Sequence, residues 1–360
     1  MHHHTMIKYI GSKRKLVPLL GAVAAELPIS SACDIFAGTT RVGQELRRRG
    51  LVVSSNDLSH YTEQFGYAYI VADGGEDRTA LQEILDECNQ LEGYDGYFTK
   101  TFCEQARYFQ PKNGRRVDAI RDHLDTLSLS PPARGILLTS LIEAADRVDS
   151  TTGVQMAYLK KWAARSEKDM QLLLPETVPG PVGSVSRCDA NQLAPKVETD
   201  LTYIDPPYNQ HSYAGNYHIW ETLVRWDQPE AYGVARKRED TKTNKSAYNS
   251  KRSAKDTFDD LLGNLSSPWL MVSFSNEGYH ESDHVIVQLQ KQRKFVKVLA
   301  VDYKRYVGAQ IGIHDLKGNK VGSVSHLRNK ELLFLAGPEL EPLEAACDAA
   351  IRQELAEQHT

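Results

Sequence analysis

Strand and helix patterns alternate over residues 32–57, and this stretch narrows the choice of folds more than any other. ACDIFAG (32–38) indicates a short buried strand that leads into a glycine turn. TTRVGQELRRRG (39–50) has a helical pattern that ends at Gly50, and LVVSSND (51–57) indicates a second strand. Strand, glycine turn, helix and strand in this order predict the opening of a doubly wound α/β sheet.

From about residue 60 to 180 the pattern changes to amphipathic helices. Apolar residues recur every three or four positions in TALQEILDECNQL (79–91), RVDAIRDHLDTL (116–127) and ARGILLTSLIEAADRV (133–148). We expect FQPKNGRR (109–116) to be a turn between two helices, and LPETVPGPVGS (174–184) to be a linker back to the sheet. Strand patterns are absent here, so the sequence predicts a helical insertion.

The sheet pattern then resumes. Strands are predicted in TDLTYID (199–205), PWLMVSFS (268–275) and KFVKVLAVDY (294–303). In KVGSVSHLRNKELLFLAG (320–337) we expect a hairpin in which VGSVS pairs with ELLFLA, and a final helix follows over 339–357. The predicted division is a first core segment over residues 1–59, a helical insertion over 60–185, a second core segment over 186–338 and a C-terminal helix over 339–360.

Composition limits the partners and the cellular compartment. The net charge of −4 means that any nucleic-acid-binding surface must be local. The five cysteines are not in CxxC spacing, which argues against structural zinc and a disulfide framework: Cys33, Cys88, Cys103, Cys188 and Cys347. No apolar run has membrane-spanning length, so we expect a soluble cytoplasmic protein with no membrane partner and no metal. The terminal MHHHT is either a tag remnant or native.

An acid, two prolines and a tyrosine follow the predicted strand in LTYIDPPYNQHSY (201–213). Ligands of open α/β sheets bind beyond the carboxyl ends of the strands, where Asp34, Asp57 and Asp205 are expected. The paired prolines fix the backbone after Asp205. This turn can therefore hold a carboxylate, a backbone carbonyl and the ring of Tyr208 in one rigid cluster.

Such a cluster suits a planar amino group. Asp205 and the Pro206 carbonyl can each accept one N–H, while Tyr208 stacks on the ring that carries the amine. The nitrogen lone pair then lies out of the ring plane and can attack an electrophile. The donor that fits a glycine turn and a ribose-binding acid is S-adenosylmethionine.

Three motifs in order carry a family resemblance: KYIGSKRKL, DIFAGTTRVG and DPPY. Together they resemble the Dam-like (alpha-group) DNA N(6)-adenine methyltransferases, over residues 7–57 and 186–336. NYHIWETLVRWD and VSHLRNKELLF look like one branch of that family. The resemblance implies a Rossmann-like, S-adenosylmethionine-dependent core with the insertion as target-recognition domain. It also implies methyl transfer to the N(6) amino group of a flipped-out adenine at specific sites in double-stranded DNA.

The resemblance also assigns roles to individual residues. The methyl donor is expected to contact Tyr9, Lys13, Asp34, Phe36, Gly38, Asp57 and Asp189. Within this set Lys13 meets the donor's carboxylate, Asp57 its ribose hydroxyls and Asp189 its adenine. Asp205, Pro206 and Tyr208 form the catalytic turn. One position departs from the family's FxGxG turn, because Thr40 stands where the last glycine is expected.

Several of these residues also have a plain structural interpretation. Taken alone, Asp34 could cap a helix, Asp57 could form a turn, and Phe36 could belong to the core. Lys13 lies in GSKRK, which could be a solvated basic run. Each interpretation is decided by burial and contacts, which the sequence does not contain.

DNA contact is predicted in RKREDTKTNKSAYNSKRSAK (236–255), which holds eight Lys and Arg against two acids, a net charge of +6. The cations expected on phosphates are Lys242, Lys245, Lys251 and Arg252. The alternative is a solvated, flexible loop. The arginines at 47–49 are expected to cap their helix.

Two other functions stay open at this point. Cytosine N(4) methylation uses similar geometry, and a non-catalytic DNA-binding relative would keep part of the pattern. The enzyme could act alone or beside a separate cognate restriction endonuclease. The DNA recognition sequence is not predicted, because base readout depends on side-chain geometry.

Overall fold

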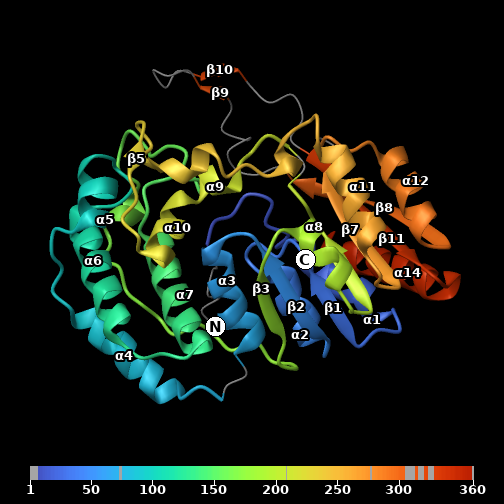
Figure 1. Ribbon diagram of the computed structural model, residues 1–360, viewed down its shortest axis with the longest axis horizontal. Helices are drawn as coiled ribbons and strands as arrows, with labels where there is room; N and C mark the ends of the chain where they lie inside the picture. The colour runs from blue at the N-terminus through green and yellow to red at the C-terminus, as the bar shows by residue number, and fades with distance from the viewer. Residues whose placement is uncertain are drawn as a thin grey trace. The chain divides into compact units, whose positions relative to one another are not determined.

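The computed structural model describes residues 7–72, 75–207, 209–275, 278–304, 313–314, 320–322 and 328–358. The chain forms two compact units that interleave along the sequence (Figure 1). The first unit contains residues 1–13, 37–189 and 211–245. The second contains residues 14–36, 190–210 and 246–360.

The first unit combines two parallel strands with most of the helices. Strands β2 (Val52–Asp57) and β3 (Ser184–Arg187) are paired in register, with Asp57 opposite Arg187. The α-helices of this unit are α2 (Arg41–Arg48), α3 (His60–Gly66), α4 (Arg78–Gln90), α5 (Tyr97–Thr99), α6 (Pro111–Thr126), α7 (Pro131–Arg147), α9 (Tyr213–Asn216) and α10 (His218–Arg225). The described residues between β2 and β3 contain no strand, as the helical pattern predicts.

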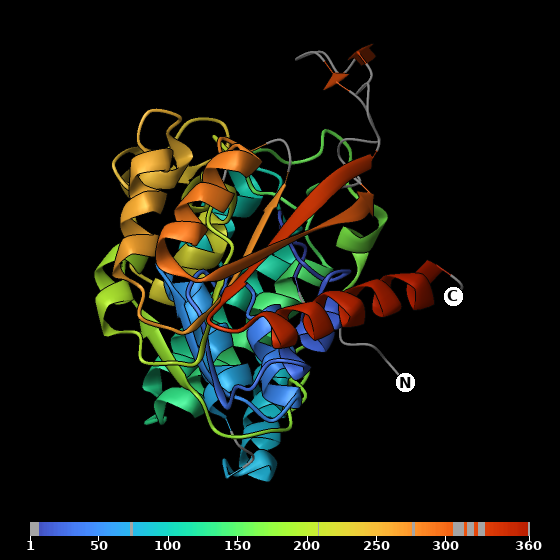
Figure 2. The same cartoon turned by 90° about the vertical axis from the view of Figure 1, so that its right-hand side faces the viewer.

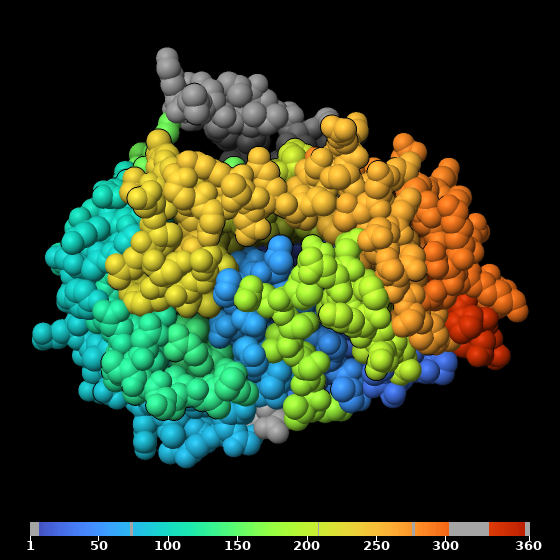
Figure 3. Space-filling model, in the orientation of Figure 1, coloured from blue at the N-terminus to red at the C-terminus, as the bar shows by residue number. Residues whose placement is uncertain are grey.

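Helix α7 is the centre of this helical region. Every residue from Gly135 to Asp146 is buried, because the sequence presents apolar or small side chains all round the helix except at Glu143 and Asp146. Helix α6 contributes Val117, Ile120 and Leu124 to the same core. A hairpin of two short strands, β5 (Ala231–Tyr232) and β6 (Lys237–Arg238), lies at the surface and is yellow in Figure 3.

The main strands of the second unit are paired in the order β1-β4-β7-β11-β8. Strands β1 (Ser31–Asp34), β4 (Leu201–Ile204) and β7 (Trp269–Ser275) are parallel. Strand β11 (Arg328–Gly337) is antiparallel to both β7 and β8 (Phe295–Lys304). Together with the helices of both units, these mostly parallel strands confirm the predicted α/β fold class.

Helices cover both faces of these strands (Figure 2). Helices α11 (Ala254–Asn264) and α12 (Ser282–Gln292) pack on one face, where Phe258 and Leu289 share a core with Val272. Helices α1 (Val17–Ala25) and α14 (Leu340–Gln358) pack against one another. A short helix, α8 (Ala190–Leu193), precedes β4.

Two local predictions are wrong. Residues 111–116 of the predicted turn belong to α6, because Pro111 occupies the first helical turn, where a missing N–H costs nothing. Gly114 is there for close packing, since a Cβ at this position would overlap Cys103 Sγ. The expected hairpin is also different: Glu331–Ala336 pair with β7 and β8, and β10 (Lys320–Gly322) pairs with β9 (Ile313–His314). Residues 323–325 of VGSVS lie outside the described residues.

Candidate cofactor and catalytic site

Asp57 ends β2, at the carboxyl end of a parallel strand in the first unit. Its Oδ1 accepts the backbone N–H of Leu58 at 2.7 Å and of Ser59 at 3.1 Å, and its Oδ2 accepts that of Gly38 at 3.0 Å. Burial raises the pKa of Asp57, and these backbone bonds oppose the shift. The carboxylate is therefore held in one orientation against the glycine turn.

The glycine turn packs directly on Tyr9. Gly38 has a φ of +50°, and a Cβ there would lie 3.1 Å from Cε1 of Tyr9. The Tyr9 ring stacks on Tyr217 with 4.5 Å between centroids, and its hydroxyl lies 3.3 Å from that of Tyr61. Burial raises the pKa of Tyr9 well above its ordinary value, so its phenol is neutral. The structure thus brings Tyr9, Gly38 and Asp57 together.

Thr40, which stands where the resemblance leads us to expect glycine, has a left-handed backbone conformation that favours glycine. Its φ is +59° and its side chain is fully buried. This conformation is unusual for a β-branched residue. The Thr40 Oγ1 accepts a hydrogen bond from Gln44 Nε2 at 3.1 Å, which ties the strained residue to α2.

Asp189 lies at the same strand edge as Asp57. It follows β3, which is the parallel neighbour of β2. The buried Asn56 joins the two strand ends: its Oδ1 accepts the N–H of Cys188 and its Nδ2 donates to the Cys188 carbonyl, both at 3.1 Å. The sequence analysis did not predict a role for Asn56. The feature that pointed to it was its position directly before Asp57, a predicted site residue.

Lys13 does not belong to a solvated run. Its side chain is 7% exposed, whereas Arg14 and Lys15, which follow it, are exposed. Burial of a lysine costs free energy unless hydrogen bonds or an opposite charge compensate its ammonium. The surroundings of Lys13 must therefore provide such compensation. Its role toward the donor's carboxylate stays a prediction.

The described residues of the predicted catalytic turn, Asp205 and Pro206, belong to the second unit. All four residues of β4 are buried, and β4 lies between β1 and β7. Asp34 ends β1 opposite Tyr203 and is 1% exposed, while Asp205 and the buried Pro206 follow β4. Asp34 and Asp205 are therefore at the carboxyl ends of their strands, as predicted, and the structure shows that these two strands are adjacent and parallel. Tyr208 lies outside the described residues.

Phe36 belongs to an aromatic contact of the second unit. Its ring meets that of Tyr248 edge-on, with 5.2 Å between centroids, and the Tyr248 hydroxyl donates to Asn191 Oδ1 at 2.7 Å. Tyr248 comes from the predicted basic loop and is a core residue. The next residue, Asn249, donates from Nδ2 to the Asn209 carbonyl at 2.7 Å. Asn209 directly follows the predicted catalytic turn in sequence.

The basic stretch is folded over much of its length. Arg238 is 2% exposed and donates to Asp227 at 2.7 Å and to Asp240 at 3.0 Å. Lys242 lies 2.6 Å from Glu239 and 4.3 Å from the ring centroid of Tyr232. The remaining cations expected on DNA are exposed: Lys245, Lys251 and Arg252.

The arginines at 47–49 lie at the end of their helix, as predicted: Arg47 and Arg48 are in the last turn of α2, and Arg49 is its C-terminal cap residue. Arg47 is 1% exposed, and its Nη1 donates to the Tyr69 carbonyl at 2.9 Å. It is thus a core residue that joins α2 to the π-helical segment Tyr67–Val71. Arg49 pairs with Glu45 at 2.9 Å along α2.

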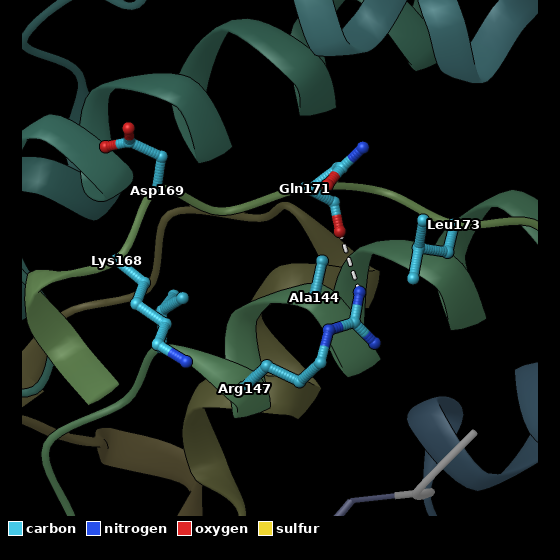
Figure 4. Close-up of a pocket in the computed structure, with 7 residues that line it drawn as sticks. Ala144, Arg147, Lys168, Asp169, Gln171 and Leu173 are labelled. Carbon is cyan, nitrogen blue, oxygen red and sulfur yellow. Dashed lines mark hydrogen bonds between the residues drawn. The ribbon is translucent and has the colours of Figure 1, made fainter. Parts of the chain in front are cut away.

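A separate cavity of about 300 Å³ opens beside the end of α7 (Figure 4). Its lining consists of Ala144, Arg147, Val148, Lys168, Asp169, Gln171 and Leu173. Arg147 donates to the Gln171 carbonyl at 2.7 Å, and Asp169 pairs with Lys112 at 2.6 Å. None of the individual residues predicted to bind donor or phosphate lines this cavity, and we assign it no function.

Two further features of the described ranges bear on the predictions. Among these residues, no helix has the length and apolar character needed to cross a membrane. The same portion of the chain contains no group of three or more His, Cys, Asp or Glu side chains arranged to hold a metal ion.

Comparison with known proteins places this geometry in a family. The chain is 27% identical to the type II methyltransferase M.NlaIII of Neisseria lactamica over 90% of this chain and 99% of that protein. It is 29% identical to modification methylase StsI of Streptococcus sanguinis over 91% of this chain, and 27% identical to modification methylase LlaI of Lactococcus lactis over 83%. The chain spans about half the length of each of these two, 51%. Residues 9–280 match the family's sequence pattern, so the chain belongs to the D12 class N6 adenine-specific DNA methyltransferase family.

Proposed function

We propose that this enzyme transfers the methyl group of S-adenosylmethionine to the N(6) amino group of adenine at a specific site in double-stranded DNA. We also propose that it belongs to the Dam-like, alpha-group branch of the family. The observation that carries the donor assignment is the Asp57 carboxylate, oriented by three backbone N–H groups beside a glycine at positive φ, where a Cβ would press on the Tyr9 ring.

The residues present fit the donor chemically. A carboxylate with two acceptor oxygens suits the two vicinal ribose hydroxyls, and Asp57 offers one at a strand end. The other residues proposed to bind the donor are Tyr9, Lys13, Asp34, Phe36, Gly38 and Asp189. When bound, S-adenosylmethionine supplies a methyl group made electrophilic by its sulfonium.

The catalytic turn prepares the amine to receive that methyl group. Asp205 and the Pro206 carbonyl accept the two N–H hydrogens, which leaves the nitrogen lone pair available. Flipping the base out of the duplex costs a few kcal/mol. Stacking on Tyr208 returns about 1–3 kcal/mol, by analogy with other base–aromatic contacts.

The proposal includes the surroundings of the reaction. Residues 60–185 act as the target-recognition domain between the core segments 1–59 and 186–338. The DNA phosphates are bound by Lys242, Lys245, Lys251 and Arg252. Lys242 must then exchange its Glu239 partner for a phosphate, so we expect it to contribute least. Because its relatives are named type II methyltransferases and modification methylases, we propose a restriction–modification setting in the cytoplasm with a separate endonuclease.

Incubation with tritiated S-adenosylmethionine and unmethylated duplex DNA tests the proposal. Label recovered in N(6)-methyladenine supports it, label in N(4)-methylcytosine supports the cytosine alternative, and no label indicates a non-catalytic relative. Asp205→Ala should abolish labelling and leave donor affinity nearly unchanged in calorimetry. Near-normal turnover of this variant would show that Asp205 is not catalytic.

A further inference from the structure

A long loop between α7 and the 3₁₀ segment Ala164–Glu167 has a fixed conformation without regular structure. This loop, residues 148–163, is called the α7 loop below. Its Ser150 N–H donates to the Tyr108 carbonyl at 2.7 Å, and the Ser150 carbonyl accepts from Leu159 N–H at 2.9 Å. Loops of this length in compact proteins are usually functional or disordered, and these bonds argue for function.

Gln155 anchors the α7 loop to the segment that follows the catalytic turn in sequence. Its N–H donates to the Asn216 carbonyl at 2.7 Å, and its Oε1 accepts from Ile219 N–H at 2.8 Å. Its carbonyl accepts from His218 Nε2 at 3.0 Å. Burial lowers the pKa of His218 to about 3, so this ring is neutral and the bond does not depend on physiological pH. Figure 1 shows the green loop beside α10 and β5.

The base of the α7 loop is tied to the predicted donor-binding segment. Asp149 lies 3.3 Å from Lys8 Nζ and 2.6 Å from Arg165 Nη2. Lys8 directly precedes Tyr9 and also pairs with Asp146 at 2.8 Å. The buried Asp149 therefore holds the two ends of the loop together, and Gln155 holds its middle.

This anchored loop presents cations at its surface. From Ser150 to Ser166 the chain holds Lys160, Lys161 and Arg165 and no acid. Lys160 and Lys161 are exposed. Arg107 donates from Nη1 to the Lys160 carbonyl at 2.7 Å and lies over the ring of Trp162 at 4.8 Å, which supports the backbone that carries both lysines.

A further cation belongs to the same region of the first unit. The Tyr108 hydroxyl lies 2.7 Å from the Gln155 carbonyl and 3.0 Å from that of Ala235, so it joins the α7 loop to the β5–β6 hairpin. Two residues later, Lys237 Nζ lies 3.7 Å from the position of a Cβ on Gly215 in α9. Its ammonium is thus placed beside the helix that comes next after the catalytic turn in sequence.

We propose that Lys160, Lys161 and Lys237 form a phosphate-binding surface for the substrate duplex, in addition to the cations of the 236–255 stretch assigned above. The inference rests on the proposed function for its ligand. Duplex DNA is the occupant because the two loop lysines are exposed on an anchored backbone in a stretch that contains no acid. A protein with net charge −4 must bind DNA through such local groups.

Salt-dependent binding tests this surface. Each phosphate contact contributes about −0.9 to the slope of log affinity against log salt, so Lys160→Ala/Lys161→Ala should flatten it by roughly 1.8 and Lys237→Ala by roughly 0.9. Affinity should fall equally for cognate and unrelated duplexes, because phosphate contacts do not read sequence. Fluorescence anisotropy with a labelled duplex measures both.

Lys291→Ala/Lys294→Ala is the matched control. These exposed lysines precede β8, which runs in the same direction as β4, so they lie at the strand edge opposite Asp205 within the second unit. The control should leave the salt slope unchanged. Donor affinity and melting temperature should stay at wild-type values in all variants, and Lys→Gln versions replace any variant that melts early.

The outcomes separate the inference from the function. If the wild type methylates adenine and both surface variants keep its salt slope, the surface is wrong and the function stands. If the wild type methylates no base, the function is wrong, and the slopes still report whether the surface binds DNA. Flattened slopes in the surface variants, with an unchanged slope in the control, support the surface.

Discussion

Asp57 has a carboxylate that is already in contact with three backbone N–H groups, so its geometry does not depend on a ligand. Asp57→Ala should weaken donor binding by a charged hydrogen bond, roughly 1.5–3 kcal/mol or about 10- to 150-fold in Kd. Calorimetry with S-adenosylmethionine measures this loss. An unchanged Kd would reject the ribose role.

The same residue predicts a pH dependence. Burial raises the pKa of Asp57, so it takes up a proton at a higher pH than an ordinary aspartate does. Protonation removes the charged acceptor, and donor affinity should therefore fall as pH falls through this raised pKa. Asp57→Asn, which is neutral throughout, should bind weakly and with a flatter pH profile in the same calorimetric series.

Thr40 allows a test of backbone strain at the glycine turn. Thr40→Gly and Thr40→Ala both remove the hydroxyl that accepts from Gln44, but only glycine relieves the positive φ. The left-handed conformation costs a side-chain-bearing residue roughly 1–2 kcal/mol, so the glycine variant should be more stable than the alanine variant by about that amount. Urea denaturation compares them; equal stabilities would mean that the turn relaxes.

At the scale of elements, the segment from residue 9 to 11 depends on tyrosines from α9 and its end. The Ile10 N–H donates to the Tyr217 hydroxyl at 2.5 Å, and Tyr9 stacks on the same ring. Tyr217→Phe keeps the stack and removes the acceptor, which should cost about 1 kcal/mol in positioning Tyr9. We expect donor Kd to rise about fivefold while DNA affinity stays unchanged.

Tyr69→Phe is the matched control for that variant. Tyr69 is also buried, and its hydroxyl donates to the side chain of Glu143 at 2.6 Å, whereas that of Tyr217 accepts from the backbone of Ile10. Tyr69→Phe should lower the free energy of unfolding about as much as Tyr217→Phe does, but it should leave the donor Kd unchanged. Equal donor affinities for the two variants would show that Tyr217 has no positioning role.

Elements with strong periodicity were predictable, and elements defined by pairing were not. Apolar runs predict the strands β1, β2, β4, β7 and β8. Apolar residues at three- to four-residue spacing predict the helices α4 and α7. β3 was missed because SVSR is short, polar and only partly buried. The partner of β11 was wrong because strand pairing is a long-range choice that local pattern does not encode.

For the site residues too, local patterns predicted positions in the chain, whereas features that depend on long-range contacts could not be predicted. The positions of Asp34, Asp57 and Asp205 at strand ends could be predicted, because each acid directly follows or ends an apolar strand pattern. The burial of Lys13, Arg47 and Arg238 could not, since a basic run has the same letters whether it is solvated or folded. The α7 loop was also missed, because its order comes from Gln155 and Asp149 contacting distant segments.

For the molecule as a whole, buried carboxylates make global stability depend on pH. Glu143 is 2% exposed and accepts from the Tyr69 hydroxyl, and burial raises its pKa from 4.5 to about 7. Between these two values the unfolded chain is ionised at this position while the folded chain keeps the proton. The folded state then binds more protons, so stability falls as pH rises through this window and levels off above it.

Glu143→Gln removes this dependence while keeping an oxygen that can accept from Tyr69. Relative to wild type, its free energy of unfolding should increase by up to roughly 3 kcal/mol as pH rises from about 4.5 to about 7, at 1.36 kcal/mol per pKa unit. Urea unfolding across this range measures the difference. Glu83→Gln, which removes the same charge from an exposed position on α4, is the control. If the two variants show the same pH profile, the folded state does not hold a proton on Glu143, and its carboxylate must instead be stabilised by the nearby Arg147 and Arg41.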